Sequence, residues 1–496
     1  MIQQAPVFIV LLPLTAALFC MLVSKFSKRM GSLMVLAAIA GAFFSALSVL
    51  CQTLAAGKPV HYWMGGWAPP LGIEFVLDPL NALLAVVITF VSILVFIYSR
   101  PFFKNEDWLQ VGGYNTLFAL LTVGMCGMVI TGDVFNLYVY LEVMSLAGYG
   151  LIALGGRKSM IAAFRYLLLG TIGASLYLIG VAYLYAMTGT LNMADMAARV
   201  APQLDSPLFA AAVACFVIGF GIKMALFPLH GWQPDSYTYA HPAAAPFIAG
   251  VMSKIPAYAI IRFLFYLFGT DNYVVASALN LIGVLGAAGI LLGSVMALAQ
   301  YDMRRLLAYS SVAQIGYIAV GLALGNVYGF IGAVLHIISH AFMKSSLFLV
   351  AGGLQYRFGE TNIYRLGGIG QKMKLSSMTL VLAAFSMVGL PPTAGFFSKL
   401  YLLIGSYESG QYIYIAVLVI SSLLNAVYFT RILEQLMVTK EGRLEDKETH
   451  EGACELPLAM LVPIVVAGIG VLALGIFSAD IVEFVIKSGL PEVLLK

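Results

Sequence analysis

The chain has 496 residues, of which 61% are hydrophobic and only 10% are charged, with a net charge of +4. An ordinary soluble domain has about 25% charged residues, and no water-soluble fold can hide so much apolar side chain from water. The composition therefore excludes a soluble enzyme, a nucleic-acid-binding protein and a disordered chain, and it leaves a protein with many membrane spans.

Fourteen apolar runs are long enough to cross a bilayer, which takes about 20 residues in a helix. The runs do not alternate apolar and polar residues as barrel strands do, so helices are predicted. In chain order, the predicted spans are 5–23, 32–54, 77–99, 113–131, 133–154, 159–187, 207–228, 241–268, 273–299, 305–323, 328–353, 375–406, 411–433 and 457–484. The sequence thus predicts an all-α integral membrane protein with about 14 transmembrane helices.

Lysine and arginine are distributed unequally between the loops on the two sides of the predicted bundle. The loops after odd-numbered helices, with the span edges beside them, hold 17 of the 27. The loops after even-numbered helices, with the C-terminal tail, hold 4. Positively charged loops stay in the cytoplasm, so both termini are expected outside. The longest loop, 434–456, has charges of both signs and is expected to be a solvated cytoplasmic connector.

Several charged residues lie inside predicted spans, where each is disfavoured by about 2.5–3.5 kcal/mol on insertion scales. Glu142 lies near the middle of the fifth span, Lys223 in the seventh, Lys254 in the eighth and Lys399 in the twelfth. A structural ion pair is the alternative interpretation for any one of them. Buried membrane charges are more often functional, however, and four of them together favour a function in transport.

The eleventh span carries His336, His340 and Lys344 at steps of four, so their side chains share one stripe of a helix. A lone histidine in an apolar helix is usually a satisfied core residue, but two with a lysine favour a pathway. The set suits proton movement, because a carboxylate that moves relative to a lysine changes whether that lysine holds its proton.

The tenth span carries hydroxyl and amide side chains that could hold the waters of a proton wire. Bonding between neighbouring helices is an equally good interpretation, because polar side chains bond across helices in membranes. The residues are Ser310, Ser311, Gln314 and Tyr317.

Other polar residues in or beside the spans have simpler interpretations. Arg165, Arg262 and Glu408 lie near span ends and are expected to reach the membrane interface. Asp78 and Asp133 open the third and fifth spans and are expected to cap those helices.

Proline interrupts two of the spans. The seventh runs into Leu226-Phe-Pro-Leu-His-Gly-Trp232, and the twelfth contains Gly389-Leu-Pro-Pro-Thr-Ala-Gly-Phe396. Proline removes a backbone hydrogen bond, and such breaks are tolerated in membranes where they line a cavity. Paired interruptions in two halves indicate a transporter built from repeats.

The two breaks lie five helices apart, so repeats of five helices are predicted, with the second inverted because five is odd. The predicted division of the chain is residues 1–112 for helices 1–3, 113–268 for the first repeat (helices 4–8), 269–433 for the inverted second repeat (helices 9–13), and 434–496 for a cytoplasmic loop and helix 14.

These segments resemble the antiporter-like subunits shared by respiratory complex I, membrane-bound hydrogenases and multisubunit Mrp cation/proton antiporters. The resemblance covers nearly the whole chain. It is carried by Gly132-Asp-Val-Phe-Asn-Leu-Tyr-Val-Tyr-Leu-Glu142, Lys223-Met-Ala-Leu-Phe-Pro-Leu-His-Gly-Trp232, Asp302-Met-Arg-Arg-Leu-Leu-Ala-Tyr-Ser-Ser-Val-Ala-Gln-Ile-Gly-Tyr317, His336-Ile-Ile-Ser-His-Ala-Phe-Met-Lys-Ser-Ser-Leu-Phe348 and Gly389-Leu-Pro-Pro-Thr-Ala-Gly-Phe-Phe-Ser-Lys399.

The resemblance assigns roles to the buried charges. It implies that Glu142 and Lys223 form a pair and that Lys254 is the central proton carrier. It also implies a terminal site at Lys399, with a relay that comprises His336, His340 and Lys344.

The segment Asp133-Val-Phe-Asn-Leu-Tyr-Val looks most like the D-type subunit of the Mrp antiporters. The resemblance therefore implies a proton-translocating subunit of a multisubunit Na+/H+ antiporter in a prokaryotic plasma (inner) membrane. A proton-pumping subunit of a complex I or hydrogenase assembly, which would be part of a redox-driven enzyme, is the first alternative. A membrane scaffold without transport is the second.

The expected partners are other membrane subunits, protons, Na+ and the lipid bilayer, and no nucleic acid is expected. No cofactor is expected, because the chain has no P-loop and no Gly-x-Gly-x-x-Gly turn. The five cysteines lie outside metal-ligand spacing, so neither a metal site nor a disulfide framework is predicted, and buried thiols are expected instead.

Overall fold

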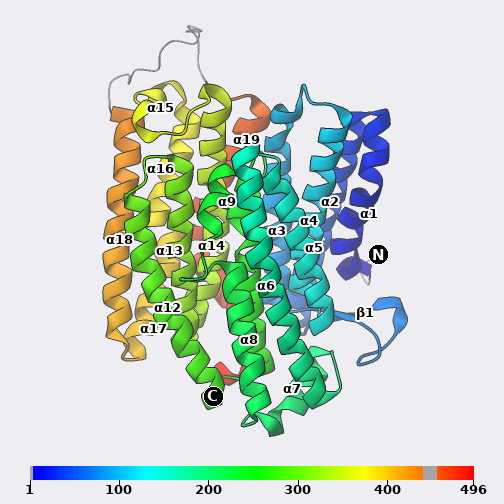
Figure 1. The fold of residues 1–496 in the computed structure, drawn as a ribbon. Coiled ribbons are helices and arrows are strands. Elements are labelled where there is room, and N and C mark those ends of the chain that lie inside the picture. Colours follow the sequence, from blue (N-terminus) through cyan, green and yellow to red (C-terminus); the bar gives the residue numbers. More distant parts are fainter. Residues whose placement is uncertain (1–3, 439–454, 496) are drawn as a thin grey trace.

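The computed structural model describes residues 4–438 and 455–495, and most of these residues are helical (Figure 1). In this part of the chain, thirteen segments are long and apolar enough to cross a membrane. They are α1 (Ala5–Phe26), α2 (Lys28–Ala56), α3 (Pro79–Ser99) with η3 (Arg100–Phe103), α4 (Trp108–Ile130), α5 (Val134–Ala153), α6 (Arg157–Thr188), α8 (Pro207–Met224), the segment Ala245–Leu267, α12 (Tyr273–Leu298), α13 (Met303–Ala323), α14 (Val327–Phe358), α18 (Tyr412–Leu433) with η8 (Glu434–Val438), and α19 (Leu458–Ile476).

Two shorter helices make one further crossing. These are α16 (Lys374–Val388) and α17 (Ala394–Glu408), which are separated by the predicted proline break. The all-α membrane fold with about fourteen spans is therefore confirmed. The segment Ala245–Leu267 is itself composite and consists of α10 (Ala245–Phe247), η5 (Ile248–Met252), α11 (Lys254–Ile261) and η6 (Arg262–Leu267).

The remaining elements are short. They are η2 (Met64–Gly66), α7 (Met193–Val200), η4 (Ala201–Gln203), α9 (Gln233–Tyr239), η7 (Ile363–Arg365), α15 (Ile369–Lys372), α20 (Ser478–Asp480), η9 (Ile481–Ile486), η10 (Lys487–Gly489) and η11 (Glu492–Leu494). Most of the predicted connector 434–456 lies outside the described residues.

Short polar side chains begin several of the long helices. Asp78 Oδ1 accepts a hydrogen bond from the Asn81 backbone at 2.9 Å, within a capping box at the start of α3. Asp133 Oδ1 accepts from the Asn136 backbone at 2.6 Å at the start of α5. These bonds satisfy backbone N–H groups that the first helical turn leaves free. The predicted capping by Asp78 and Asp133 is therefore confirmed.

Both predicted helix breaks are present. The helix α8 ends at Met224, the next residue, Ala225, has a positive φ of 63°, and the chain resumes as α9 after Pro228. The helix α16 ends at Val388, the next residue, Gly389, has a φ of 95°, and the chain resumes as α17. The indole nitrogen of Trp232 donates to the Ile222 carbonyl at 2.8 Å and so satisfies a carbonyl near the first break.

Two matching β-bridges, one in each half of the chain, support an inverted relation between the halves. Asp133 forms an isolated antiparallel bridge with Asn192, and Asp302 forms the same bridge with Asn362. The first bridge adjoins α7 and the second precedes α15, and Figure 1 places α7 and α15 at opposite ends of the bundle. The boundaries of the repeats, 113–268 and 269–433, remain a prediction.

The long helices differ in how much of their surface is buried. In the most apolar window of α14 all residues are buried, and in that of Ala245–Leu267 94% are buried, against 33% for α2 and 39% for α1. The helices α1 and α18 lie at opposite edges of the bundle in Figure 1. The candidate residues on α11 and α14 are therefore held in the interior of the molecule.

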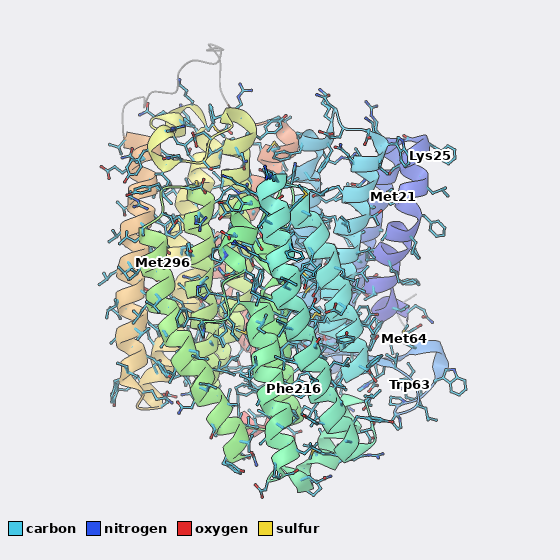
Figure 2. All side chains as sticks on the ribbon, viewed as in Figure 1. Met21, Lys25, Trp63, Met64, Phe216 and Met296 are labelled. Atoms are coloured by element: carbon cyan, nitrogen blue, oxygen red, sulfur yellow. The ribbon has the colours of Figure 1, made fainter. Side chains whose placement is uncertain are left out.

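A two-stranded hairpin, which the sequence patterns do not predict, lies between α2 and α3. Its strands are β1 (Val60–Trp63) and β2 (Glu74–Leu77), paired antiparallel. Figures 1 and 2 show this hairpin, with the labelled Trp63, projecting beyond the helices. Glu74 anchors the hairpin because it accepts from the Asn192 amide at 2.7 Å and contacts His61 Nδ1 at 3.1 Å.

The expectation of buried thiols holds for only part of the described cysteines. Cys20 and Cys126 are buried, but Cys51 is exposed and Cys215 is half-buried. The helix α2, which carries Cys51, has most of its surface on the outside of the bundle, so an apolar run does not by itself bury a thiol. Cys454 lies outside the described residues.

Candidate functional site

The structure brings together the two charges predicted to pair on the fifth and seventh spans. The Lys223 ammonium on α8 lies 3.6 Å from Oε1 of Glu142 on α5. The Lys223 side chain is fully buried, and 26% of the Glu142 side chain is exposed. Because a charge in the middle of a bilayer is strongly disfavoured, each group stabilises the charged form of the other.

Two further side chains of α5 contact the same ammonium. Lys223 donates to Ser145 Oγ at 2.6 Å and to the Tyr149 hydroxyl at 3.4 Å. Ser145 and Tyr149 follow Glu142 at helical spacing, so the three polar side chains share one face of α5. Gly170 on α6 leaves room for this cluster, because a Cβ there would lie 2.0 Å from the Tyr149 hydroxyl oxygen.

Lys254 is the first residue of α11 and is buried. Its ammonium donates to the backbone carbonyl of Ala249, which lies in the π-helical turn η5. A π-helical turn departs from the regular α-helical hydrogen-bond pattern and is frequent at functional sites. Within the described residues, this lysine forms no ion pair with a carboxylate.

The stripe predicted on the eleventh span is present on α14, and all three of its side chains are fully buried. The rings of His336 and His340 are stacked with centroids 5.8 Å apart. His336 Nδ1 is hydrogen-bonded to Ser398 Oγ at 2.9 Å. The Lys344 ammonium donates to the Leu307 carbonyl at 2.8 Å and lies between α13 and α14.

Lys399 on α17 reaches back across the second helix break. Its ammonium donates to the carbonyls of Met387 at 2.8 Å and Val388 at 3.0 Å, and to Ser422 Oγ at 3.2 Å. The two carbonyls end α16, where the helix dipole favours a cation. The ring of Tyr317 also faces the ammonium, with its centroid 5.0 Å away.

The candidate residues on α11, α14 and α17 form one electrostatic cluster. Lys254, Lys344 and His336 lie close enough to His340 for their charges to act on it. Lys399 and Lys254 act on His336 in the same way. A change of charge at one of these groups therefore affects its neighbours.

Some polar residues of the tenth span bond to protein groups, and others are placed to bind the waters of a proton wire. Tyr317 bonds between helices through the Leu418 carbonyl at 3.4 Å, and Ser311 bonds to Leu307 within its own helix. Gln314 is buried, and both polar atoms of its side chain lack a partner among the described residues, as do both ring nitrogens of His340. Buried polar atoms of this kind are usually satisfied by water, which favours hydration at this part of α13 and α14.

Arg262 is largely buried, with 16% of its side chain exposed, and its reach to the membrane interface stays a prediction. Its guanidinium is in an ion pair with Oδ2 of Asp78, and its Nε donates to the Tyr258 hydroxyl at 2.5 Å. Asp78 therefore caps α3 with one oxygen and binds an arginine of η6 with the other. The two residues are 184 positions apart in the chain, so no local pattern indicates their contact.

Arg165 and Glu408 lie closer to the expectation for span ends. Arg165 has 62% of its side chain exposed, but it also donates to Asp235 Oδ2 on α9 at 2.8 Å. Arg305 contacts the other oxygen of Asp235 at 3.4 Å, so α9 is joined to both α6 and α13. Glu408 is exposed at the end of α17.

Arg304 is buried, although its position in the sequence groups it with the charged residues of the loops. Its guanidinium donates to the Gln355 side chain at 2.7 Å and to the carbonyls of Tyr237 and Ala240 at the end of α9. Arg304 therefore holds the short helix after the first break against α13 and α14. Its place beside the span edge gives no signal of this burial.

Two family models match the sequence. The model described as NADH:quinone oxidoreductase/Mrp antiporter, TM, matches residues 131–425. The model described as NADH-Ubiquinone oxidoreductase (complex I), chain 5 N-terminus, matches residues 63–118. Together they include every helix that carries a candidate residue.

Individual proteins of both kinds are similar to the chain. NADH-quinone oxidoreductase subunit N of Desulforudis audaxviator is 47% identical over 498 residues, which cover 99% of each chain. The D-type subunit of the Na(+)/H(+) antiporter of Alkalihalophilus pseudofirmus is 30% identical over 405 residues, which cover 81% of each. A chain of the membrane-bound sulfane sulfur reductase, an archaeal respiratory membrane complex, superposes with a TM-score of 0.90 at 28% identity, covering 99% of this chain and 98% of that one.

Proposed function

The chain belongs to the NADH:quinone oxidoreductase/Mrp antiporter family and is an antiporter-like, multi-pass membrane subunit. On that basis we propose that it translocates protons within a redox-driven membrane assembly of the complex I type. The 47% identity to a subunit N over 99% of both chains supports this choice. The sequence motifs favour the D-type subunit of the Mrp antiporters, and the 30% identity to such a subunit supports that assignment less strongly.

One observation carries the proposal: four buried lysines lie on four different helices of the interior, and among the described residues only one of them contacts a carboxylate. Lys223 has Glu142 as its counter-ion, whereas Lys254, Lys344 and Lys399 are held by backbone carbonyls and hydroxyls. A buried lysine without a counter-ion has a small free-energy difference between its charged and neutral forms. Such groups can take up and release protons.

The roles proposed for the site residues follow their surroundings. Glu142 controls the charge of Lys223, and Lys254 carries protons between the two halves. His336, His340 and Lys344 relay protons along α14 to the terminal site at Lys399. Water at Gln314 and His340 connects groups that do not touch.

A scaffold without transport fits the geometry less well. Removing a charge from a membrane interior is favourable unless the charge has a function. Three lysines without a carboxylate partner in the described part of the chain would destabilise a purely structural subunit, and an apolar side chain of similar length would fill the same space. The buried charges therefore favour transport over a structural role.

The second candidate function is proton movement coupled to Na+ in an Mrp-type antiporter, which the similarity to a D-type antiporter subunit favours. Both candidates require other membrane subunits as partners. We place both assemblies in a prokaryotic plasma membrane, with both termini of this chain outside.

The test is purification of the tagged full chain from its native membranes, with identification of the co-purifying proteins. Iron–sulfur or flavin proteins, together with proton uptake into inverted vesicles on quinone reduction, would support the redox-driven assembly. Small membrane subunits alone, with proton flux driven by a Na+ gradient, would support the antiporter. An intact complex that moves protons under neither condition would favour the interpretation that the chain is a membrane scaffold without transport.

The single polypeptide is expected not to transport by itself, because the proposed driving reaction takes place in other subunits. The check is purified chain in liposomes that contain a pH-sensitive dye. Full cation-driven or redox-driven proton flux with this chain alone would contradict the proposal.

A further inference from the structure

A chain of polar side chains joins Lys344 to Lys399, and two of its members are not among the residues predicted from the sequence. The Lys344 ammonium donates to Ser310 Oγ at 2.8 Å, and Ser310 Oγ lies 3.1 Å from the Tyr428 hydroxyl. The Tyr428 hydroxyl is also hydrogen-bonded to Oδ1 of Asn425. Asn425 and Tyr428 are three residues apart, so both side chains lie on one face of α18.

The chain ends at the backbone carbonyl of Met387, in the last turn of α16. Asn425 Nδ2 donates to this oxygen at 3.2 Å, and Lys399 Nζ donates to it at 2.8 Å. The amide and the ammonium therefore share one acceptor. Asn425 and Tyr428 are fully buried, so bulk water does not replace these bonds.

The Tyr428 hydroxyl stands between two acceptors in this chain. An ammonium only donates, so Ser310 Oγ accepts from Lys344. The Tyr428 hydroxyl is placed to donate either to Ser310 Oγ or to the Asn425 carbonyl oxygen, and it has one proton for the two. An amide does not readily release its protons, so proton hopping stops at Asn425. What the chain can transmit beyond this point is orientation.

We infer that Tyr428 and Asn425 are positioning residues that couple the charge of Lys344 to the placement of the Lys399 ammonium. When Lys344 is charged, its ammonium occupies the Ser310 oxygen, so the Tyr428 proton goes to the Asn425 carbonyl oxygen and holds the Asn425 amide against the Met387 carbonyl. When Lys344 is neutral, its amine can accept from Ser310, and the Tyr428 proton can turn to the freed Ser310 oxygen. The Asn425 amide is then less firmly held, and Lys399 gains the shared carbonyl.

This inference deepens the proposed function and rests on it, because coupling between two lysines has a consequence only if protons move. Other titratable or charged groups lie around the chain without belonging to it. Arg431, on the same helix, is bonded to the carbonyls of Leu298 and Gln300. The other groups face Lys344 or Lys399 from α11, α13 and α14, and they are Lys254, Tyr317, His336 and His340.

The experiment uses three variants of the complete complex in inverted membrane vesicles. Tyr428→Phe removes the hydroxyl and keeps the ring, and Asn425→Leu removes both amide bonds at similar volume. The matched control is Tyr98→Phe, because the buried Tyr98 hydroxyl donates to the Leu349 carbonyl at 2.9 Å, away from the chain. Proton transport is measured over a series of pH values and divided by the amount of assembled complex.

Tyr428→Phe and Asn425→Leu are expected to lower transport about tenfold, the equivalent of one buried hydrogen bond. Both should also move the alkaline limb of the rate-against-pH curve toward lower pH, because charged Lys344 loses the aligned hydroxyls that stabilise it. Tyr98→Phe should keep the wild-type curve.

An unchanged pH profile in both α18 variants would overturn the inference, whether or not the rate falls, because a merely structural bond does not set this profile. A loss confined to the amount of assembled complex would overturn it as well. These outcomes differ from failure of the proposed function, in which the wild-type complex itself moves no protons.

Discussion

The two lysines beside the helix breaks are stabilised in different ways. Lys223, at the end of α8, has the Glu142 carboxylate 3.6 Å away and two hydroxyls of α5. Lys399, just after the second break, has no carboxylate partner in the described part of the chain and donates to two carbonyls at the end of α16. The charge of the first lysine thus depends on one side chain, whereas that of the second depends on the geometry of a helix end.

The two halves also differ at one position of the helices that the predicted repeats match. Asp133 and Asp302 cap α5 and α13 in the same way and form matching bridges. Nine residues after each of them lie Glu142 and Ser311, respectively. The Ser311 hydroxyl bonds within its own helix. Ser311 thus supplies no carboxylate at the position that the predicted repeats match to Glu142, and Lys399 is held by two backbone carbonyls and the Ser422 hydroxyl.

The largest effect is expected at the carboxylate. Glu142→Gln leaves Lys223 without its counter-ion, so the lysine should stay neutral and transport should be lost with little change of shape. Glu142→Asp keeps the charge with a shorter reach and should retain partial activity. The measurement is proton transport per assembled complex, with Glu408→Gln as a control at an exposed acid.

If the pair is only a structural contact, Glu142→Gln will instead lower the amount of complex. Normal turnover per complex at low abundance would contradict a switching role. Normal abundance with abolished turnover would support it.

Replacing Lys223 should destabilise the fold more than replacing Lys399. Lys223→Met leaves Glu142 unpaired and should destabilise the fold by roughly 1–3 kcal/mol, less than for a fully buried pair because 26% of that side chain is exposed. Lys399→Met leaves no unpaired charge and should assemble nearly normally. The check is the amount and thermal stability of the purified complex, and equal losses in both variants would refute the asymmetry.

A second arm sharpens this comparison. Adding Glu142→Gln to Lys223→Met removes the unpaired carboxylate, so the abundance of the complex should recover while transport stays absent. Failure to recover would show that Lys223 stabilises the fold by packing and not by charge.

The histidines of α14 should matter through protonation. His336→Gln and His340→Gln keep hydrogen bonding but cannot titrate near neutral pH, so the double replacement should lower transport about 100-fold, as expected for loss of a proton-transfer group. Each single replacement should have a smaller effect. Wild-type transport in both single replacements and the double replacement would return the stripe to a structural role.

The smallest effect is expected at the glycine that faces the first lysine. A Cβ at Gly170 would lie 2.0 Å from the Tyr149 hydroxyl oxygen and 3.5 Å from the Lys223 ammonium. Gly170→Ala should therefore displace Tyr149 and lower transport severalfold without removing any charge. Gly113→Ala is the control, because nothing lies within 4 Å of a Cβ there. Equal activity of the two variants would show that the Lys223–Tyr149 contact is dispensable.

Features that depend on local composition could be predicted from the chain alone. Apolar runs of about 20 residues indicated the number of spans, because a helix must be long enough to cross the hydrocarbon layer. Proline at 228 and 392 indicated both breaks, since proline removes a backbone donor wherever the chain packs. Asp78 and Asp133 indicated helix starts, because a cap involves only its own first turn.

Spacing also placed the candidate residues on correct faces. Steps of four put His336, His340 and Lys344 on one stripe of α14, and the structure keeps them there. The resemblance to a family supplied the pairing of Glu142 with Lys223, because helical spacing relates residues of one helix and not of two.

Which distant groups meet depends on the packing of the whole bundle. In the sequence Arg262 is a residue at the end of a span, but in the fold α3 places Asp78 in contact with it. Arg304 is beside a loop in the sequence, but in the fold it binds carbonyls at the end of α9. Tyr428 and Asn425 stand in an apolar helix and join the site only because α18 packs beside α16. Hydrophobic periodicity fixes which face of a helix is buried, but the partner across that face depends on how all the helices pack together.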